Sequence, residues 1–130
     1  MVSLLAILAL GAVWCTGAFP SGAYHKKLAN DICIQIDALE DLTIREYVLC
    51  AQSGAVIHLG VTGSNPYTVA PSSQKDYDDF YKFLISQCGD ALKSKGMHEF
   101  TYDQANDTIK TTFQSSPQVL QRGNCWDNGF

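Results

Sequence analysis

Three histidines and one neighbouring carboxylate are the residues of this chain whose types could support acid–base chemistry. His25, His58 and His98 do not follow the HxxxH or HExxH spacing of zinc proteases. His98 and Glu99 are adjacent, but consecutive residues of a strand point to opposite faces, so they cannot exchange a proton directly. A proton-transfer site would need two strands to bring His58 beside Glu99.

Together with Arg45 or Arg122 as a phosphate-stabilising cation, His58 and Glu99 would form a site of the kind found in small secreted ribonucleases. A histidine in the middle of an apolar strand is more often a hydrogen-bonded structural residue. We favour that interpretation, so His58 and Glu99 are weak catalytic candidates and nuclease activity is the alternative hypothesis.

Other catalytic and cofactor-binding motifs are not found in the sequence. It contains no GxSxG elbow, no GxxxxGK[ST] phosphate loop and no D-x-[DN]-x-[DN]-G calcium loop. The four cysteines of the expected mature chain have no CxxC spacing, which argues against structural zinc. We therefore expect no metal and no cofactor.

The first 18 residues have the layout of a secretory signal. Residues 4–13 are apolar, and small residues at Thr16 and Ala18 suit cleavage after Ala18. The apolar run is shorter than the roughly 20 residues that span a bilayer, so a membrane anchor is not expected. The sequence predicts a secreted, extracellular protein with a signal at 1–18, a flexible segment at 19–30 and one domain at 31–130.

The mature chain is mildly acidic and rich enough in cysteine for internal bridges. With a net charge of -4, the chain has no obvious basic surface for nucleic acid, so we expect no nucleic-acid partner. We also expect a monomer. An even number of cysteines in a small exported domain predicts two disulfides. Four cysteines can pair in three ways, and the sequence does not decide among them. A bridge from the predicted helix to a strand that it covers is favoured. The cysteines are Cys33, Cys50, Cys88 and Cys125.

The segment 72–96 predicts the main helix of the domain. Its apolar residues recur at helical spacing, with Ser73 as N-cap and Gly96 as the stop. Cys88 lies on the same apolar face, which suits a disulfide. The residues of that face are Tyr77, Phe80, Tyr81, Leu84, Cys88 and Leu92.

Alternating and continuous apolar patterns predict strands at 31–37 and 55–61, a short edge strand at 67–69 and a hairpin formed by 98–103 and 108–113. We expect a helix over 38–47, with a strand over 44–50 as the alternative, and a polar surface tail at 115–124. This order predicts an α+β fold, with one antiparallel sheet and one or two helices on one face. It would be an α/β sandwich, ferredoxin-like in one arrangement.

Two further features concern the surface. Asn106-Asp107-Thr108 is an N-glycosylation sequon at the expected hairpin tip, so a glycoprotein is predicted. Tyr67 and Trp126 would form a protein or glycan contact if both rings were exposed together. The alternative is that Trp126 packs beside the Cys125 bridge.

The leader MVSLLAILALGAVWCTGA, the four mature cysteines, the helix YDDFYKFLISQC and the ending NCWDNGF together resemble small secreted effector proteins of plant-associated fungi. Some of these proteins share the α/β-sandwich scaffold of fungal killer toxins. The resemblance implies a virulence-related effector that binds a host or cell-surface component, a protein or a glycan, without catalysis. A toxin or antimicrobial protein is the other alternative.

Overall fold

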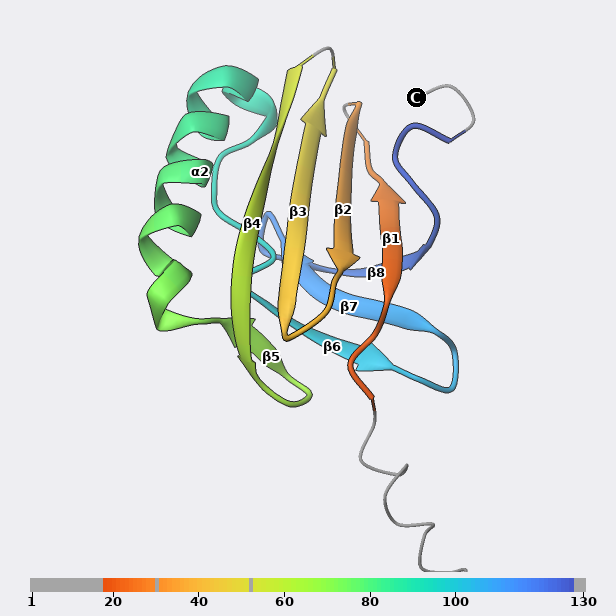
Figure 1. The fold of residues 1–130 in the computed structure, drawn as a ribbon. Helices are drawn as coiled ribbons and strands as arrows, with labels where there is room; N and C mark the ends of the chain where they lie inside the picture. The colour runs from red at the N-terminus through yellow and green to blue at the C-terminus, as the bar shows by residue number, and fades with distance from the viewer. Residues whose placement is uncertain (1–17, 30, 52, 128–130) are drawn as a thin grey trace, which may run out of the picture.

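The computed structural model describes residues 18–29, 31–51 and 53–127, so the predicted signal at 1–18 lies almost wholly outside the described residues. Within the described part, strands β1 to β8 form a closed antiparallel barrel in which each strand pairs with the next and β8 pairs with β1 (Figure 1). The strands are β1 (Gly22–Lys27), β2 (Ile32–Ala38), β3 (Thr43–Cys50), β4 (Ser53–Gly63), β5 (Tyr67–Val69), β6 (Glu99–Asp103), β7 (Thr108–Phe113) and β8 (Ser116–Arg122).

The closed barrel shows that the predicted α+β sandwich, ferredoxin-like or otherwise, is wrong. Three strands fall where the sequence predicted something else. Residues 22–27 form β1 inside the segment expected to be flexible, residues 43–50 form β3 where a helix was expected, and residues 116–122 form β8 in place of a polar tail. With these strands in place the sheet has a partner for every edge, which closes it into a barrel.

The predicted helix over 38–47 fails because its capping residue belongs to a strand. Asp37 is the sixth residue of β2, and the chain then turns through Asp41 and Leu42, both in the left-handed backbone region. Side chains from Thr43 to Cys50 alternate between half-buried and buried, which is the period-two pattern of a strand with one face in the core. The strand alternative for this stretch is therefore the correct one.

The main helix is confirmed, although it is shorter than predicted. α2 (Gln74–Cys88) buries Tyr77, Phe80, Tyr81 and Leu84, and it ends at Gly89, whose φ is +61°, instead of at Gly96. Ser73 makes no side-chain cap; its hydroxyl accepts a hydrogen bond from the Gly60 N–H at 2.9 Å. That bond ties the start of α2 to β4 instead of serving the helix itself.

Large side chains fill the inside of the barrel. Ile34, Ile36 and Ile44 come from the first strands, Phe100 and Ile109 come from the later ones, and all five are nearly inaccessible. The α2 helix lies beside β4 (Figure 1) and adds its aromatic face to the same cluster. The interior is therefore a packed core of the kind expected for a small barrel.

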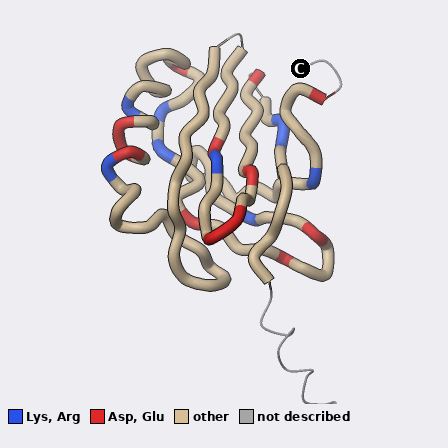
Figure 2. The backbone as a smooth tube through the Cα atoms, in the orientation of Figure 1, with Lys and Arg blue, Asp and Glu red and all other residues tan. Residues whose placement is uncertain are grey.

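Two disulfides join parts of this arrangement that lie far apart in the sequence. Cys50 of β3 is bonded to Cys88 at the end of α2, so the expected bridge between the helix and a strand is confirmed. Cys33 of β2 is bonded to Cys125, which follows β8. Positions of Lys and Arg are interspersed with positions of Asp and Glu along the backbone (Figure 2).

Candidate functional site

Exposed aromatic and apolar side chains gather on the outer side of β3 and β4. Tyr47 of β3 lies opposite Val56 of β4, and the Trp126 ring packs edge-on against Tyr47 with 5.6 Å between ring centroids. Val56 is 49% exposed and Trp126 is 52% exposed. We call Tyr47, Val56 and Trp126 the aromatic face. Exposed rings of this kind supply both apolar area and a polar edge at contact sites.

A row of ionisable side chains borders the aromatic face. Asp37, Arg45 and His58 lie next to one another on β2, β3 and β4, and the Arg45 guanidinium is 3.5 Å from the Asp37 carboxylate. Burial, followed by the negative charge of Asp37, raises the pKa of Tyr47, so its phenol stays neutral. The Arg45–Asp37 ion pair thus stands at the border of the aromatic face.

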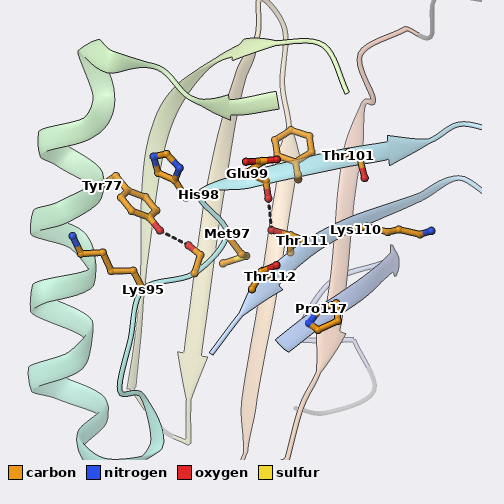
Figure 3. Close-up of a pocket in the computed structure, with 12 residues that line it drawn as sticks. Tyr77, Lys95, Met97, His98, Glu99, Thr101, Lys110, Thr111, Thr112 and Pro117 are labelled. Atoms are coloured by element: carbon orange, nitrogen blue, oxygen red, sulfur yellow. Dashed lines mark hydrogen bonds between the residues drawn. The ribbon is translucent and has the colours of Figure 1, made fainter. Parts of the chain in front are cut away.

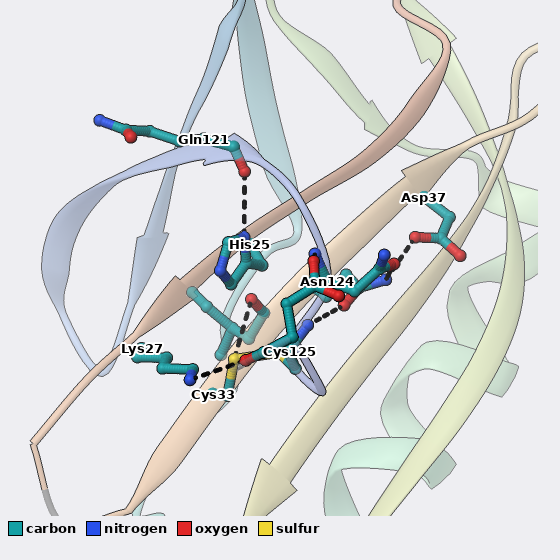
Figure 4. Close-up of a disulfide and its surroundings, with 10 residues drawn as sticks. His25, Lys27, Cys33, Asp37, Gln121, Asn124 and Cys125 are labelled. Atoms are coloured by element: carbon teal, nitrogen blue, oxygen red, sulfur yellow. Dashed lines mark hydrogen bonds between the residues drawn. A yellow bond between two sulfur atoms is a disulfide. The ribbon is translucent and has the colours of Figure 1, made fainter. Parts of the chain in front are cut away.

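The C-terminal segment is fastened across the outer side of β2 (Figure 4). The Cys125 N–H donates to the Gln35 side-chain oxygen at 2.7 Å, next to the Cys33–Cys125 disulfide. The Gln35 amide donates to Asp37 at 2.7 Å and to Asn124 at 3.2 Å. Gln35 is fully buried and its amide is fully used. A covalent bond and this network therefore hold the segment that carries Trp126.

A shallow hollow opens where the chain passes from α2 to β6 (Figure 3). It has a volume of about 490 Å³, and its lining includes Tyr77, His98, Glu99 and Lys110. His98 Nε2 is 2.8 Å from Gln74 Oε1, and its ring packs edge-on against Tyr77 at 5.0 Å. The imidazole is thus held by the helix. We call this cavity the His98 hollow.

A second hollow lies at the hairpin between β6 and β7, and Lys110 belongs to the lining of both hollows. It has a volume of about 640 Å³, and its lining includes Asn106, Thr108, Val119 and Gln121. We call it the tip hollow. In the register Thr108 faces Gln121, and Lys110 faces Val119, so these side chains form two rows on the outer side of β7 and β8. We call these two rows the polar face.

An ionic cluster closes the barrel beside the tip hollow. Asp107 accepts hydrogen bonds from Tyr24 at 2.6 Å, from Tyr102 at 2.7 Å and from Arg122 Nε at 2.7 Å. The Arg122 guanidinium also lies 4.7 Å from the centre of the Tyr24 ring. The bond from Arg122, followed by those from the two phenols, lowers the pKa of Asp107 well below its usual range. This Asp107 clasp joins β1, β8 and the hairpin.

The carboxyl group of Glu46 is buried inside the barrel beneath the aromatic face. Glu46 of β3 is fully buried, its Oε1 lies 3.5 Å from the Tyr81 hydroxyl, and its Oε2 has no partner. Burial raises the pKa of Glu46 well above its usual value, so the carboxyl is held neutral. It therefore offers no charge to a ligand on the surface.

The structure does not bring the two weak catalytic candidates together. His58 lies exposed on β4 opposite Arg45, whereas Glu99 lies on β6 opposite Thr68 of β5. No hydrogen bond or ion pair joins His58 to Glu99 in the described chain. Arg122, the other phosphate-binding candidate, is held in the Asp107 clasp.

The two predicted contact rings also lie apart. Tyr67 is 3% exposed and stacks on Phe100 with 5.2 Å between ring centroids, so it belongs to the core. Trp126 is exposed, and its neighbour is Tyr47. The sequence signal for Tyr47 is the alternation of Thr43–Cys50, which places Arg45, Tyr47 and Leu49 on one side of a strand. Assigning that stretch to a helix concealed it.

Comparisons with known proteins found no family model, no curated protein and no solved structure that matches the chain. Within residues 18–127, excluding 30 and 52, no group of three or more His, Cys, Asp or Glu side chains is placed to hold a metal ion. In the same residues no helix has the length and apolarity needed to cross a membrane.

Proposed function

We propose that this chain is an exported protein that acts by binding a protein partner of a host or a cell surface through the aromatic face. The observation that carries the proposal is the exposed Trp126 indole, held on Tyr47 by the disulfide-bonded C-terminal segment. Two disulfides in a small domain suit the oxidising conditions outside cells, in agreement with a signal at residues 1–18.

The composition of the aromatic face favours a protein over a small molecule. Trp, Tyr and Arg are the residue types that most often dominate the binding energy of protein interfaces, and Trp126, Tyr47 and Arg45 lie together here. Neither of the two hollows involves these residues. A broad, mostly apolar contact with a charged border is the usual plan of a protein interface.

Pre-organisation strengthens this argument. The ring of Trp126 is positioned by a covalent bond one residue away and by the buried Gln35 network. A partner that binds an already ordered indole does not have to pay for ordering the segment. A fixed anchor of this kind is more useful for recognition than for stability of the barrel, because half of its surface remains in water.

The test is cross-linking of the purified mature protein to intact cells and extracellular material, with two matched variants. Trp126→Ala removes the proposed anchor, and Val119→Ala removes a similarly exposed apolar side chain on the polar face. We expect one cross-linked partner to be kept by the wild type and by Val119→Ala, and its apparent affinity to fall at least about tenfold in Trp126→Ala.

Equal capture by Trp126→Ala and the wild type would contradict the proposal, as would loss of capture in both variants. The ribonuclease hypothesis has a separate measurement, hydrolysis of RNA by the same purified protein. Hydrolysis that is lost in His58→Ala would establish an enzyme in place of a binding protein.

A further inference from the structure

The turn between β6 and β7 holds the sequon asparagine in an exposed position. Asn106 lies between Asp103, the last residue of β6, and Thr108, the first residue of β7. Its backbone N–H donates to Asp103 Oδ1 at 3.2 Å, and its side-chain Nδ2 donates to Asp103 Oδ2 at 2.8 Å. One of the two amide hydrogens is therefore used within the turn.

The remaining amide hydrogen is the one that a sugar can replace. In N-glycosylation the Asn106 nitrogen attacks the anomeric carbon of a lipid-pyrophosphate-linked oligosaccharide, the bond from that carbon to the pyrophosphate oxygen breaks, and the amide loses one proton. The lipid pyrophosphate leaves with the bonding electrons and takes up the amide proton, so nothing is oxidised or reduced. The glycosylated amide keeps one N–H, which is enough for the bond to Asp103.

The other residues of the sequon leave the space beside Asn106 open. The Asp107 side chain is fully engaged by Tyr24, Tyr102 and Arg122. Thr108 lies on the outer side of β7, in the lining of the tip hollow together with Asn106. A sugar chain that leaves Asn106 therefore starts in this hollow.

The chemistry of the tip hollow suits a carbohydrate. Its volume of about 640 Å³ lies within the range of roughly 300–1,000 Å³ found for ligand pockets. Gln121, Thr108 and Lys110 offer amide, hydroxyl and ammonium groups to sugar hydroxyls. Val119, which is 42% exposed, supplies an apolar surface for the face of a sugar ring.

We propose that Asn106 carries an N-linked glycan whose first sugars lie in the tip hollow and cover the polar face. The inference rests on one part of the proposed function, the export of the protein, because the enzyme that transfers the oligosaccharide to asparagine acts in the secretory compartment. It also assigns different roles to the two outer surfaces: the glycan shields the polar face, and the aromatic face stays free for a partner.

The first measurement is the intact mass of the full chain secreted by a eukaryotic host. We expect the wild type and Thr108→Ser, which keeps the sequon, to carry an oligosaccharide that peptide N-glycosidase removes. Asn106→Gln and Thr108→Ala, which destroy the sequon by different routes, should be secreted without it. Secreted wild type without sugar would overturn the inference while leaving export intact, whereas retention of the unprocessed chain inside the cell would refute export itself.

The second measurement locates the glycan by the rate at which lysine side chains are acylated. We expect Lys110 to react several-fold more slowly in the glycosylated wild type than in Thr108→Ala, because sugars cover the hollow. Lys75 of α2, whose side chain is 86% exposed and which lies on another part of the surface, is the internal control and should react equally in both. Equal rates at Lys110 in a fully glycosylated sample would overturn the placement in the hollow.

Discussion

The two outer surfaces of this barrel are ordered by different means. The aromatic face is fixed by a disulfide and a buried amide network, and a neutral buried carboxyl lies beneath it. The polar face is fixed at its end by an ionic cluster that is partly open to water. The part of the barrel that carries the aromatic face thus depends on covalent and apolar contacts, whereas the part that carries the polar face depends on charge. The two parts should therefore respond differently to reduction and to pH.

The largest effect should come from removing the bridge that holds the C-terminal segment. The double variant Cys33→Ser with Cys125→Ser should lower the free energy of unfolding by roughly 3–4 kcal/mol, because this bridge closes a long loop in the unfolded chain. Denaturant unfolding followed by circular dichroism measures the loss. A change confined to the fluorescence of Trp126, with unchanged overall stability, would show that the segment is only an appendage of the aromatic face.

The buried carboxyl of Glu46, beneath the aromatic face, should make the protein less stable as the pH rises. Its folded-state pKa lies above the unfolded value near 4.5, so its contribution to stability is complete below that pH and is lost as pH rises toward the folded pKa. Between the unfolded and the folded pKa of Glu46, the free energy of unfolding of the wild type should fall by roughly 1 kcal/mol per pH unit relative to that of Glu46→Gln. Parallel stability curves of the two proteins between pH 5 and 8 would refute a neutral Glu46.

The Asp107 clasp, at the end of the polar face, should give the opposite dependence of stability on pH. The folded-state pKa of Asp107 lies below its unfolded value. The stabilisation by Asp107 is therefore complete at pH values above the usual pKa of an aspartate, and it is lost as the pH falls below that value. Asp107→Asn, which suits the left-handed backbone at this position, should be less stable than the wild type at neutral pH and less sensitive to acid. Thermal unfolding at neutral and acid pH tests this, and the effect should be smaller than that of the cysteine variant. Identical acid sensitivity in both proteins would show that the clasp adds nothing to stability.

The smallest effects on stability should come from single substitutions on the aromatic face and on the polar face. They test whether Trp126 serves recognition or folding. Trp126→Ala should cost about 1 kcal/mol of stability, because the ring contact with Tyr47 is lost. Val119→Ala on the polar face should stay within about 0.5 kcal/mol. A much larger loss for Trp126→Ala would mean that the indole is a structural residue, and it would weaken its assignment as a binding anchor.

Local pattern alone determined the main helix, the strand at Ile32–Ala38, the hairpin of β6 and β7 and the position of Asn106 in a turn. These features follow from hydrophobic period and turn residues, which act over a few residues. The use of four cysteines in two bridges follows from the cysteine count of the whole chain. The leader and the glycan are also sequence predictions, and they await the measurements described above.

Only the tertiary structure decided the barrel and the surfaces on it. β8 is polar, and the segment containing β1 is rich in turn residues, so neither shows a strand pattern by itself. In the fold β1 pairs with β2 and β8 pairs with β7, and the pairing of β1 with β8 then joins the two ends of the chain and closes the barrel. The meeting of Tyr47 with Trp126, and the separation of His58 from Glu99, depend on the same long-range closure. No local preference encodes such contacts, because they join residues far apart in the chain.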